Sequence, residues 1–121
     1  TIVFKDDKPI IVTGAQGGSR IITAVLQVIL NYYEFGLTAE ESIHLYRYHH
    51  QWKPETLMYE IFDETLMNEL IEMGFNLKQR PPDYDYSNGI TSSIMIEGDK
   101  LIGVSDPRSG DYMSIGISNK K

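Results

Sequence analysis

The chain has 121 residues and a mass of 13.8 kDa, enough for one domain that buries roughly two thirds of its unfolded surface. Its composition, 41% hydrophobic and 23% charged, excludes a disordered or fibrous protein. The net charge of −6 argues against a nucleic-acid partner, and the lack of cysteine excludes disulfides, thiolate catalysis and cysteine-ligated metals.

The N-terminal part predicts a β-hairpin followed by a long helix. Residues 1–4 and 10–13 are β-branched runs on either side of a charged turn. A glycine-rich turn at 14–19 then leads into the helix. The polar residues of this helix fall on one narrow stripe: Arg20, Thr23, Gln27, Asn31 and Glu34. Because the rest of its surface is apolar, we expect the helix to pack on more than one side and to end at Gly36.

The remainder of the chain predicts alternating short helices and strands. Thr38 and Glu41 fit a capping box at the start of a second helix, and a third helix begins at residue 63 or 64 and ends at Met73. A long loop at 79–89 contains two prolines and an Asn-Gly pair. Strands are expected at 57–60, 75–78, 91–96, 101–104 and 113–117. This pattern predicts an α+β fold with mainly antiparallel pairing, in a single domain covering 1–121. No apolar run reaches the roughly 20 residues of a membrane span.

The sharpest local feature is the sequence Gly14-x-x-Gly17-Gly18-Ser19 between a strand and a helix. Adjacent glycines let a ligand approach the backbone, and their N–H groups lie at the positive end of the helix dipole. Such a turn can bind a phosphate or carboxylate, or it can hold the oxyanion of an acyl-transfer reaction. It can equally be a tight turn without a ligand. The spacing matches neither the phosphate-binding loop nor the dinucleotide fingerprint.

The patterns around the histidines, Trp52, Asp106 and Arg108 favour structural roles over catalytic or metal-binding ones. His49 and His50 are adjacent and point to different sides of a regular element, so no metal site is expected. We expect both histidines and Trp52 to pack and form hydrogen bonds. Asp106 and Arg108 flank a proline, which favours an ion pair or a turn cap over direct catalysis.

Three segments together are more specific than any one of them. Residues 14–23 resemble the glycine turn and following helix of the γ-glutamyltranspeptidases (glutathione hydrolases). Residues 47–54 are similar to that family's Arg-aromatic-His-His-Gln-Trp segment, and residues 105–109 to its C-terminal Ser-Asp-Pro-Arg-Ser motif. The resemblance spans residues 1–117. It implies part of an N-terminal-nucleophile hydrolase sandwich, in which two antiparallel sheets lie between helical layers.

The resemblance assigns a role to two residues only. Gly17 and Gly18 match the glycines whose N–H groups form the family's oxyanion site, so they are the predicted oxyanion-hole and substrate-binding residues. The family's nucleophilic threonine lies upstream of the glycine turn, so no catalytic residue is expected in this chain. Thr1 is interpreted as a fragment boundary. Ala15 and Gln16 stand where many members have Ser and Pro.

The implied parent transfers a γ-glutamyl group from glutathione-like donors to water or amino acids. It is a self-cleaving precursor, periplasmic or secreted, with no cofactor. This chain resembles the C-terminal part of its small subunit, so the expected partners are the remainder of that subunit and the large subunit. The isolated chain is expected to be inactive and to expose an apolar patch or self-associate. Two alternatives stay open: a poly-γ-glutamate depolymerase or amide acylase, and a non-catalytic anion-binding module.

Overall fold

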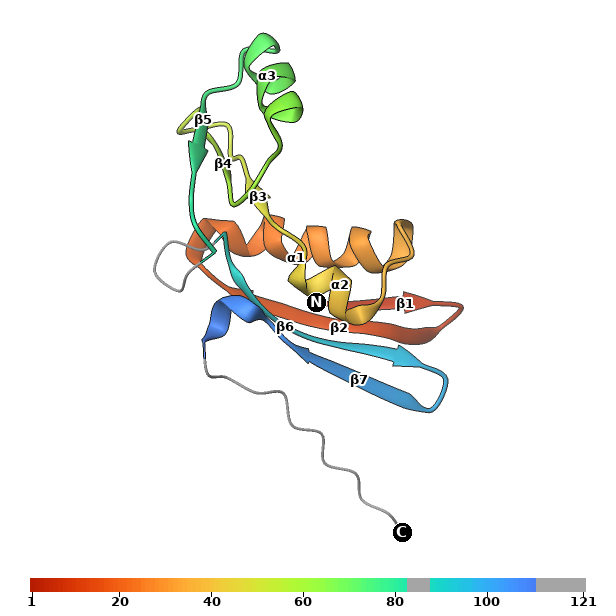
Figure 1. Cartoon of the computed structure of the whole chain (residues 1–121). Coiled ribbons are helices and arrows are strands. Elements are labelled where there is room, and N and C mark those ends of the chain that lie inside the picture. Colours follow the sequence, from red (N-terminus) through yellow and green to blue (C-terminus); the bar gives the residue numbers. More distant parts are fainter. Residues whose placement is uncertain (83–87, 111–121) are drawn as a thin grey trace.

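The computed structural model describes residues 1–82 and 88–110 of the chain. Its main layer is an antiparallel four-stranded sheet in the order β1-β2-β6-β7. The strands are β1 (Ile2–Lys5), β2 (Lys8–Gln16), β6 (Ile90–Glu97) and β7 (Lys100–Ser105). Figure 1 shows α1 (Ile21–Ile29) and α2 (Ala39–His44) on one face of this sheet. The expected α+β class is therefore confirmed.

The core lies between this sheet and the two helices. Val28 of α1, Ile43 of α2 and Met95 of β6 are fully buried and form one cluster. Ile11 is paired with Met95 across the sheet and is also fully buried. Because side chains alternate along a strand, the neighbouring residues Val12 and Ile94 point to the opposite face. Both are exposed, as no described helix covers that face.

The N-terminal hairpin forms as predicted, but its second strand is longer. Asp6 and Asp7 have positive φ angles of 50° and 59°, as in the mirror-image turns that suit hairpins. We expected a turn from residue 14 onward, whereas β2 continues to Gln16. The reason is pairing, because residues 14–16 form ladder partners with the first residues of β6, ending at Gln16 with Ile90.

The long helix is confirmed, with irregular turns at both ends. A 3₁₀ turn (Gly18–Arg20) precedes α1, a π-helical turn (Leu30–Glu34) follows it, and Gly36 has the positive φ of a helix terminator. The capping box at Thr38 and Glu41 also forms. Three members of the polar stripe on α1 make contacts with neighbouring elements: Thr23 with His49, Gln27 with Tyr48, and Asn31 with Ser42.

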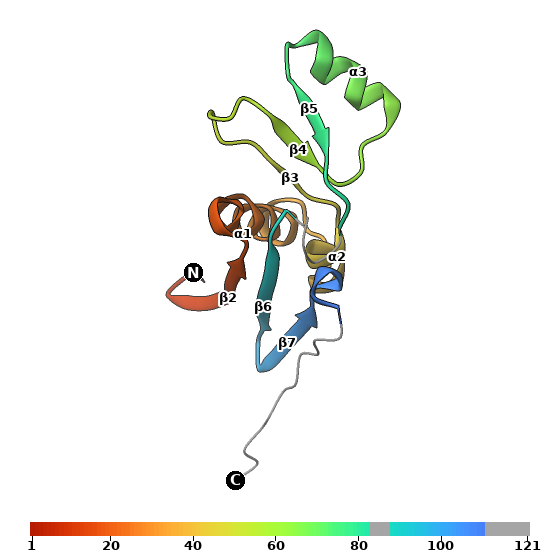
Figure 2. The ribbon, with the colours of Figure 1, turned by 90° about the vertical axis from the view of Figure 1, so that its left-hand side faces the viewer.

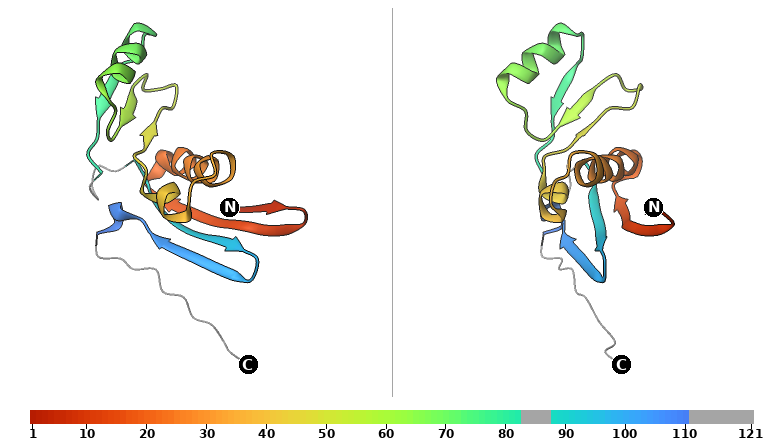
Figure 3. Two further views of the ribbon diagram at one scale, coloured as in Figure 1. Left: turned by 45° about the vertical axis from the view of Figure 1, so that its right-hand side comes forward. Right: turned by 90° about the vertical axis from the view of Figure 1, so that its right-hand side faces the viewer.

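A smaller lobe projects from the helix-covered face, as the two rotated views in Figures 2 and 3 show. It contains β3 (Tyr48–His49), β4 (Leu57–Tyr59), β5 (Leu77–Gln79) and α3 (Glu64–Glu72). Asp63 caps α3 by accepting from the Leu66 N–H, and Gly74 follows its end with a φ of 92°. The third helix is thus confirmed. β3 was not predicted. β4 pairs with β5 in parallel, whereas the other strand pairs of the described residues are antiparallel, so the expectation of mainly antiparallel pairing is confirmed.

Two predicted segments fall partly or wholly outside the described residues. They are the strand at 113–117 and part of the loop at 79–89. Over the described ranges, no helix combines the length and the apolar character needed to cross a lipid bilayer.

Candidate functional site

The glycine turn joins the last residue of β2 to the helix that begins at Gly18. Gly17 has a φ of 135° and Gly18 a φ of 63°, and both values are strongly unfavourable for residues with a side chain. A Cβ on Gly17 would lie only 3.0 Å from Gly89 Cα, whereas a Cβ on Gly18 would meet nothing within 4 Å. The turn therefore needs glycine at 17 for close packing and at 18 for its backbone conformation.

The two amides of this turn are available to a ligand. Among the hydrogen bonds of the described residues, neither the Gly17 nor the Gly18 N–H is a donor. Gly18 begins a continuous run of helical turns that extends to Glu34, so its N–H lies at the positive end of a helix dipole. The arrangement suits a carboxylate, a phosphate or an oxyanion.

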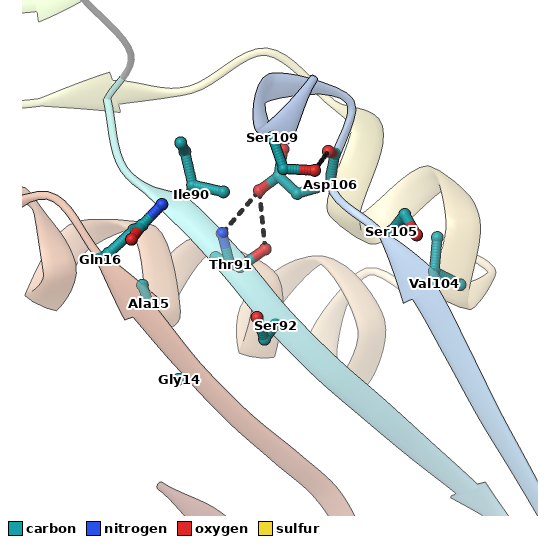
Figure 4. Close-up of a pocket in the computed structure, with 10 residues that line it drawn as sticks. All are labelled: Gly14, Ala15, Gln16, Ile90, Thr91, Ser92, Val104, Ser105, Asp106 and Ser109. Atoms are coloured by element: carbon teal, nitrogen blue, oxygen red, sulfur yellow. Dashed lines mark hydrogen bonds between the residues drawn. The ribbon is translucent and has the colours of Figure 1, made fainter. Parts of the chain in front are cut away.

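A hollow of about 600 Å³ lies next to the turn, on the strands shown in Figure 4. It is lined by the end of β2 (residues 14–16), the start of β6 (90–92) and the end of β7 with the following turn (104–106 and 109). Gly17 and Gly18 follow Gln16 directly, beside this hollow, but they are not among its lining residues. The lining is mixed: it combines apolar side chains such as Ile90 and Val104 with hydroxyl groups, and Asp106 is its charged member.

Asp106 belongs to a buried network of four charged residues, which we call the charge quartet: Arg47, Glu60, Asp106 and Arg108. Each is at most 2% exposed. Asp106 accepts from Arg47 Nη1 at 2.7 Å and from Arg108 Nη1 at 3.0 Å. Glu60 accepts from Arg108 through Nε at 2.7 Å and through Nη2. The expected ion pair of Asp106 and Arg108 is confirmed, within a larger set.

Backbone groups complete the charge quartet. Asp106 Oδ2 accepts from the N–H and the hydroxyl of Thr91, at 2.7 and 2.9 Å (Figure 4). Arg47 also donates to the carbonyls of Gly89 and Ile43, so its guanidinium joins β6 to the end of α2. The two cations and two anions balance, and each side chain has several partners, which offsets the desolvation of burying them.

The pKa shifts follow from these contacts. Burial alone would raise the pKa of Asp106, but the charge of Arg47 and the Thr91 N–H outweigh it and hold the pKa below its usual value. Burial lowers the pKa of Arg47, with partial compensation by Asp106. For Arg108, burial would lower the pKa, but the hydrogen bonds and charge of Glu60 raise it. The lowered pKa keeps Asp106 ionised at neutral pH, and the two arginines stay charged because guanidinium groups do not deprotonate in proteins.

The remaining predicted residues have structural positions. The Thr1 amine donates to the Thr13 carbonyl at 2.9 Å and so extends the β1–β2 ladder. His49 is buried between the hydroxyl of Thr23 and the side chain of Gln51. The packing role expected for Trp52 is wrong, because this residue follows β3 in a turn that leaves 74% of it exposed beneath the Lys53 ammonium group. The described residues include no cluster of potential metal ligands.

Sequence reasoning missed three residues that the site uses. The sequence places Arg47 in the segment 47–54 without indicating a role for it, and it predicts Glu60 as the last residue of a strand. Gly89 was placed in a loop, although it packs against Gly17. The available signal was weak: a charged residue ending the apolar run 57–60, and a glycine directly before a strand.

Comparisons with known proteins find relatives over almost the whole chain. The family model for gamma-glutamyltranspeptidase matches residues 1–115. The glutathione hydrolase proenzyme of Escherichia coli K12 is 43% identical over 119 residues, which cover 96% of this chain and 20% of that protein. The chain thus spans about a fifth of the length of this curated relative.

Solved structures show the same fold. A mutant gamma-glutamyltranspeptidase from Pseudomonas nitroreducens superposes with a TM-score of 0.82 at 33% identity, covering all of this chain and 61% of the other. A cephalosporin acylase from Bacillus halodurans has a TM-score of 0.77 at 23% identity, over 88% of this chain and 20% of the other. At that identity the second likeness concerns the fold alone.

Proposed function

Because the chain belongs to the gamma-glutamyltranspeptidase family, we propose that it forms the C-terminal part of the small subunit of an enzyme that transfers γ-glutamyl groups. The proposed donors are glutathione-like compounds, and the acceptors are water or amino acids. The observation that carries the proposal is the pair of amides at Gly17 and Gly18, which donate no hydrogen bond within residues 1–82 and 88–110 and lie at a helix N-terminus beside a hollow.

In the proposed reaction, these amides stabilise negative charge. The hydroxyl of a threonine outside this chain attacks the γ-amide carbonyl of the donor, and the carbonyl oxygen becomes an oxyanion that accepts from Gly17 and Gly18. The C–N bond then breaks, the amine leaves with a proton, and the γ-glutamyl group stays esterified to the threonine until an acceptor releases it. Loss of one such donor costs about 3–4 kcal/mol of transition-state stabilisation.

The apolar outer face of the four-stranded sheet supports the proposed partners. Ile2, Val12 and Ile94 are register neighbours across three strands, and Leu101 of β7 is 71% exposed on the same face. An apolar sheet face of this kind is normally buried against another layer. We infer that the remainder of the small subunit supplies the second sheet there, with the large subunit as a further partner.

The proposed setting of the parent is a self-cleaving precursor that acts in the periplasm or outside the cell. The precursor is supported by the relatives, which are named proenzymes. The location is inferred from the family resemblance.

The proposal is tested with a γ-glutamyl anilide, whose cleavage releases a coloured amine. We expect no release by the 121-residue chain alone and release by the full-length parent. In the parent, Gly18→Ala should lower kcat about a hundredfold, since the strained turn misplaces a donor while its Cβ enters open space. Release by the chain alone, or an unchanged kcat in Gly18→Ala, would contradict the proposal.

The same preparation separates the alternatives. Preferential cleavage of poly-γ-glutamate or of a side-chain amide by the parent would identify a depolymerase or an acylase. Thermal stabilisation of the chain alone by phosphate or glutamate, together with an inactive parent, would identify an anion-binding module.

A further inference from the structure

Gly89, the residue before β6, lies directly behind the glycine turn. A Cβ on Gly17 would be 3.0 Å from Gly89 Cα and 3.6 Å from its nitrogen. A Cβ on Gly89 would lie 2.8 Å from Ala24 Cβ, with the carbonyl oxygens of Arg20 and Gln16 at 3.4 and 3.6 Å. These neighbours come from both sides of the turn, from the end of β2 and from the start of the helix. Any side chain at position 89 therefore has to displace the turn or the helix.

The charge quartet fixes Gly89 from its other side. Arg47 Nη1 donates to the Gly89 carbonyl at 2.6 Å and to Asp106 Oδ2 at 2.7 Å. The preceding Asn88 is fully buried and donates through Nδ2 to the Arg47 carbonyl at 3.3 Å. The position of Gly89 is thus set by buried, hydrogen-bonded groups that do not belong to the glycine turn.

The N–H groups of Gly17 and Gly18 are held indirectly, because the hydrogen bonds of these residues are made by their carbonyls, which accept from the N–H groups of Arg20 and Ile21 at the start of the helix. The two glycine N–H groups donate no hydrogen bond within the described part of the chain, so the packing of Gly17 on Gly89 and the start of the helix determine where they lie. Oxyanion stabilisation depends on donors that are already in place, and small displacements reduce it steeply.

We propose that Gly89 is a positioning residue for the Gly17 and Gly18 amides, with Arg47 holding Gly89 in place through its carbonyl. Because residue 89 is a glycine, the glycine turn can pack closely against the backbone directly before β6. This inference rests on the proposed function, because it assumes that the two amides contact an oxyanion.

The test compares two alanine variants in the full-length parent. Gly89 and Gly74 have similar positive φ angles, 98° and 92°, but a Cβ on Gly74 would meet nothing within 4 Å. Gly74→Ala therefore measures backbone strain alone. We expect Gly89→Ala to lower kcat for the γ-glutamyl anilide about tenfold with KM nearly unchanged, and Gly74→Ala to leave both constants as they are.

Two further readouts separate positioning from a general loss of structure. A γ-boronic acid analogue of glutamate forms a tetrahedral adduct that carries the negative charge of the transition state, so its affinity should fall by the same factor as kcat/KM in Gly89→Ala. Adding Ala24→Gly removes the atom that the new Cβ meets at 2.8 Å, and it should restore about half of the lost kcat on a logarithmic scale.

If Gly89→Ala does not fold, the role of Gly89 is tested with the single substitution Ala24→Gly. It removes a contact of Gly89 and should lower kcat about threefold with KM unchanged, whereas Ala39→Gly in α2 should not. Equal losses in Gly89→Ala and Gly74→Ala, or in Ala24→Gly and Ala39→Gly, would overturn the role of Gly89. An inactive unsubstituted parent would instead overturn the proposed function.

Discussion

At the scale of single residues, we expect substitutions in the charge quartet to destabilise the fold strongly. Removing one member leaves an unpaired charge in the interior, which is far more costly than losing a surface ion pair. Asp106 occupies the centre, because its two oxygens accept from Arg47, Arg108 and Thr91. An amide at this position would turn one of these acceptors into a donor that faces other donors.

Asp106→Asn should therefore lower the free energy of unfolding of this chain by about 3–5 kcal/mol at neutral pH, as measured by urea denaturation. Because the folded-state pKa of Asp106 lies below its unfolded value, its stabilising effect is complete above about pH 4. That effect disappears as the pH falls through the folded-state pKa. As the pH is lowered below about 4, the free energy of unfolding should therefore fall less steeply in Asp106→Asn than in the unsubstituted chain.

A matched control is available in the exposed turn between β6 and β7. Asp99→Asn makes the same chemical change without a buried partner, and it should alter the free energy of unfolding by no more than about 0.5 kcal/mol. Equal effects of the two substitutions would contradict the role given to the charge quartet.

At the scale of elements, α1 buries polar side chains beside the apolar residues that it contributes to the core. Gln27 of α1 and Asn31 of the following π-helical turn are buried, while Ile22 and Leu26 of α1 are exposed. The polar residues are buried because they satisfy backbone groups of other segments: Gln27 accepts from the Tyr48 N–H and donates to the Tyr48 carbonyl. One amide side chain thus attaches β3 to α1.

Gln27→Ala should destabilise the chain more than Leu26→Ala, its neighbour on the exposed side of the same helix. The first change leaves both backbone groups of Tyr48 without a partner and should cost about 1–3 kcal/mol, whereas the second should cost less than about 1 kcal/mol. Urea denaturation of the two variants gives the comparison. A larger loss in Leu26→Ala would show that the outer face of α1 is covered in this chain.

The elements that local sequence signals define were predicted, and those that depend on distant partners were not. The first hairpin, the capping box at Thr38 and the end of the third helix at Met73 follow from turn and cap residues, which act within a few positions. β3 was missed because two residues carry no periodicity. In the candidate site, the role of Gly17 and Gly18 is a prediction from the family resemblance, because their local pattern is compatible with a turn without a ligand. The contact between Arg47 and Gly89 joins residues 42 positions apart, which no local signal reveals.

At the scale of the whole molecule, the described residues cover the four-stranded sheet on one face. The helices lie on one side, and the opposite side exposes Ile2, Val12, Ile94 and Leu101. Exposed apolar patches of more than a few hundred Å² are unusual in monomeric proteins and mark interaction surfaces. The small sheet of the projecting lobe does not reach this face (Figures 1 and 2).

The isolated chain should accordingly self-associate, with a sedimentation coefficient that rises with protein concentration. Leu101→Glu combined with Ile94→Glu should abolish this dependence, because charges at the centre of an apolar interface are strongly unfavourable. Met73→Glu adds a charge at an exposed apolar residue of the lobe and should leave association unchanged. A compact monomer at all concentrations would contradict the interpretation of this face.

The sequence Asn88-Gly89 is a potential site of slow, spontaneous damage to the backbone. A glycine after an asparagine offers the least steric hindrance to attack by its backbone nitrogen on the asparagine side chain, the reaction that leads through a succinimide to isoaspartate. In the folded chain Asn88 is fully buried and its amide is bound to the Arg47 carbonyl. Folding therefore protects Asn88 from this reaction. In molecules that stay unfolded before assembly, isoaspartate formation would add a backbone carbon directly before Gly89, the residue on which the glycine turn packs.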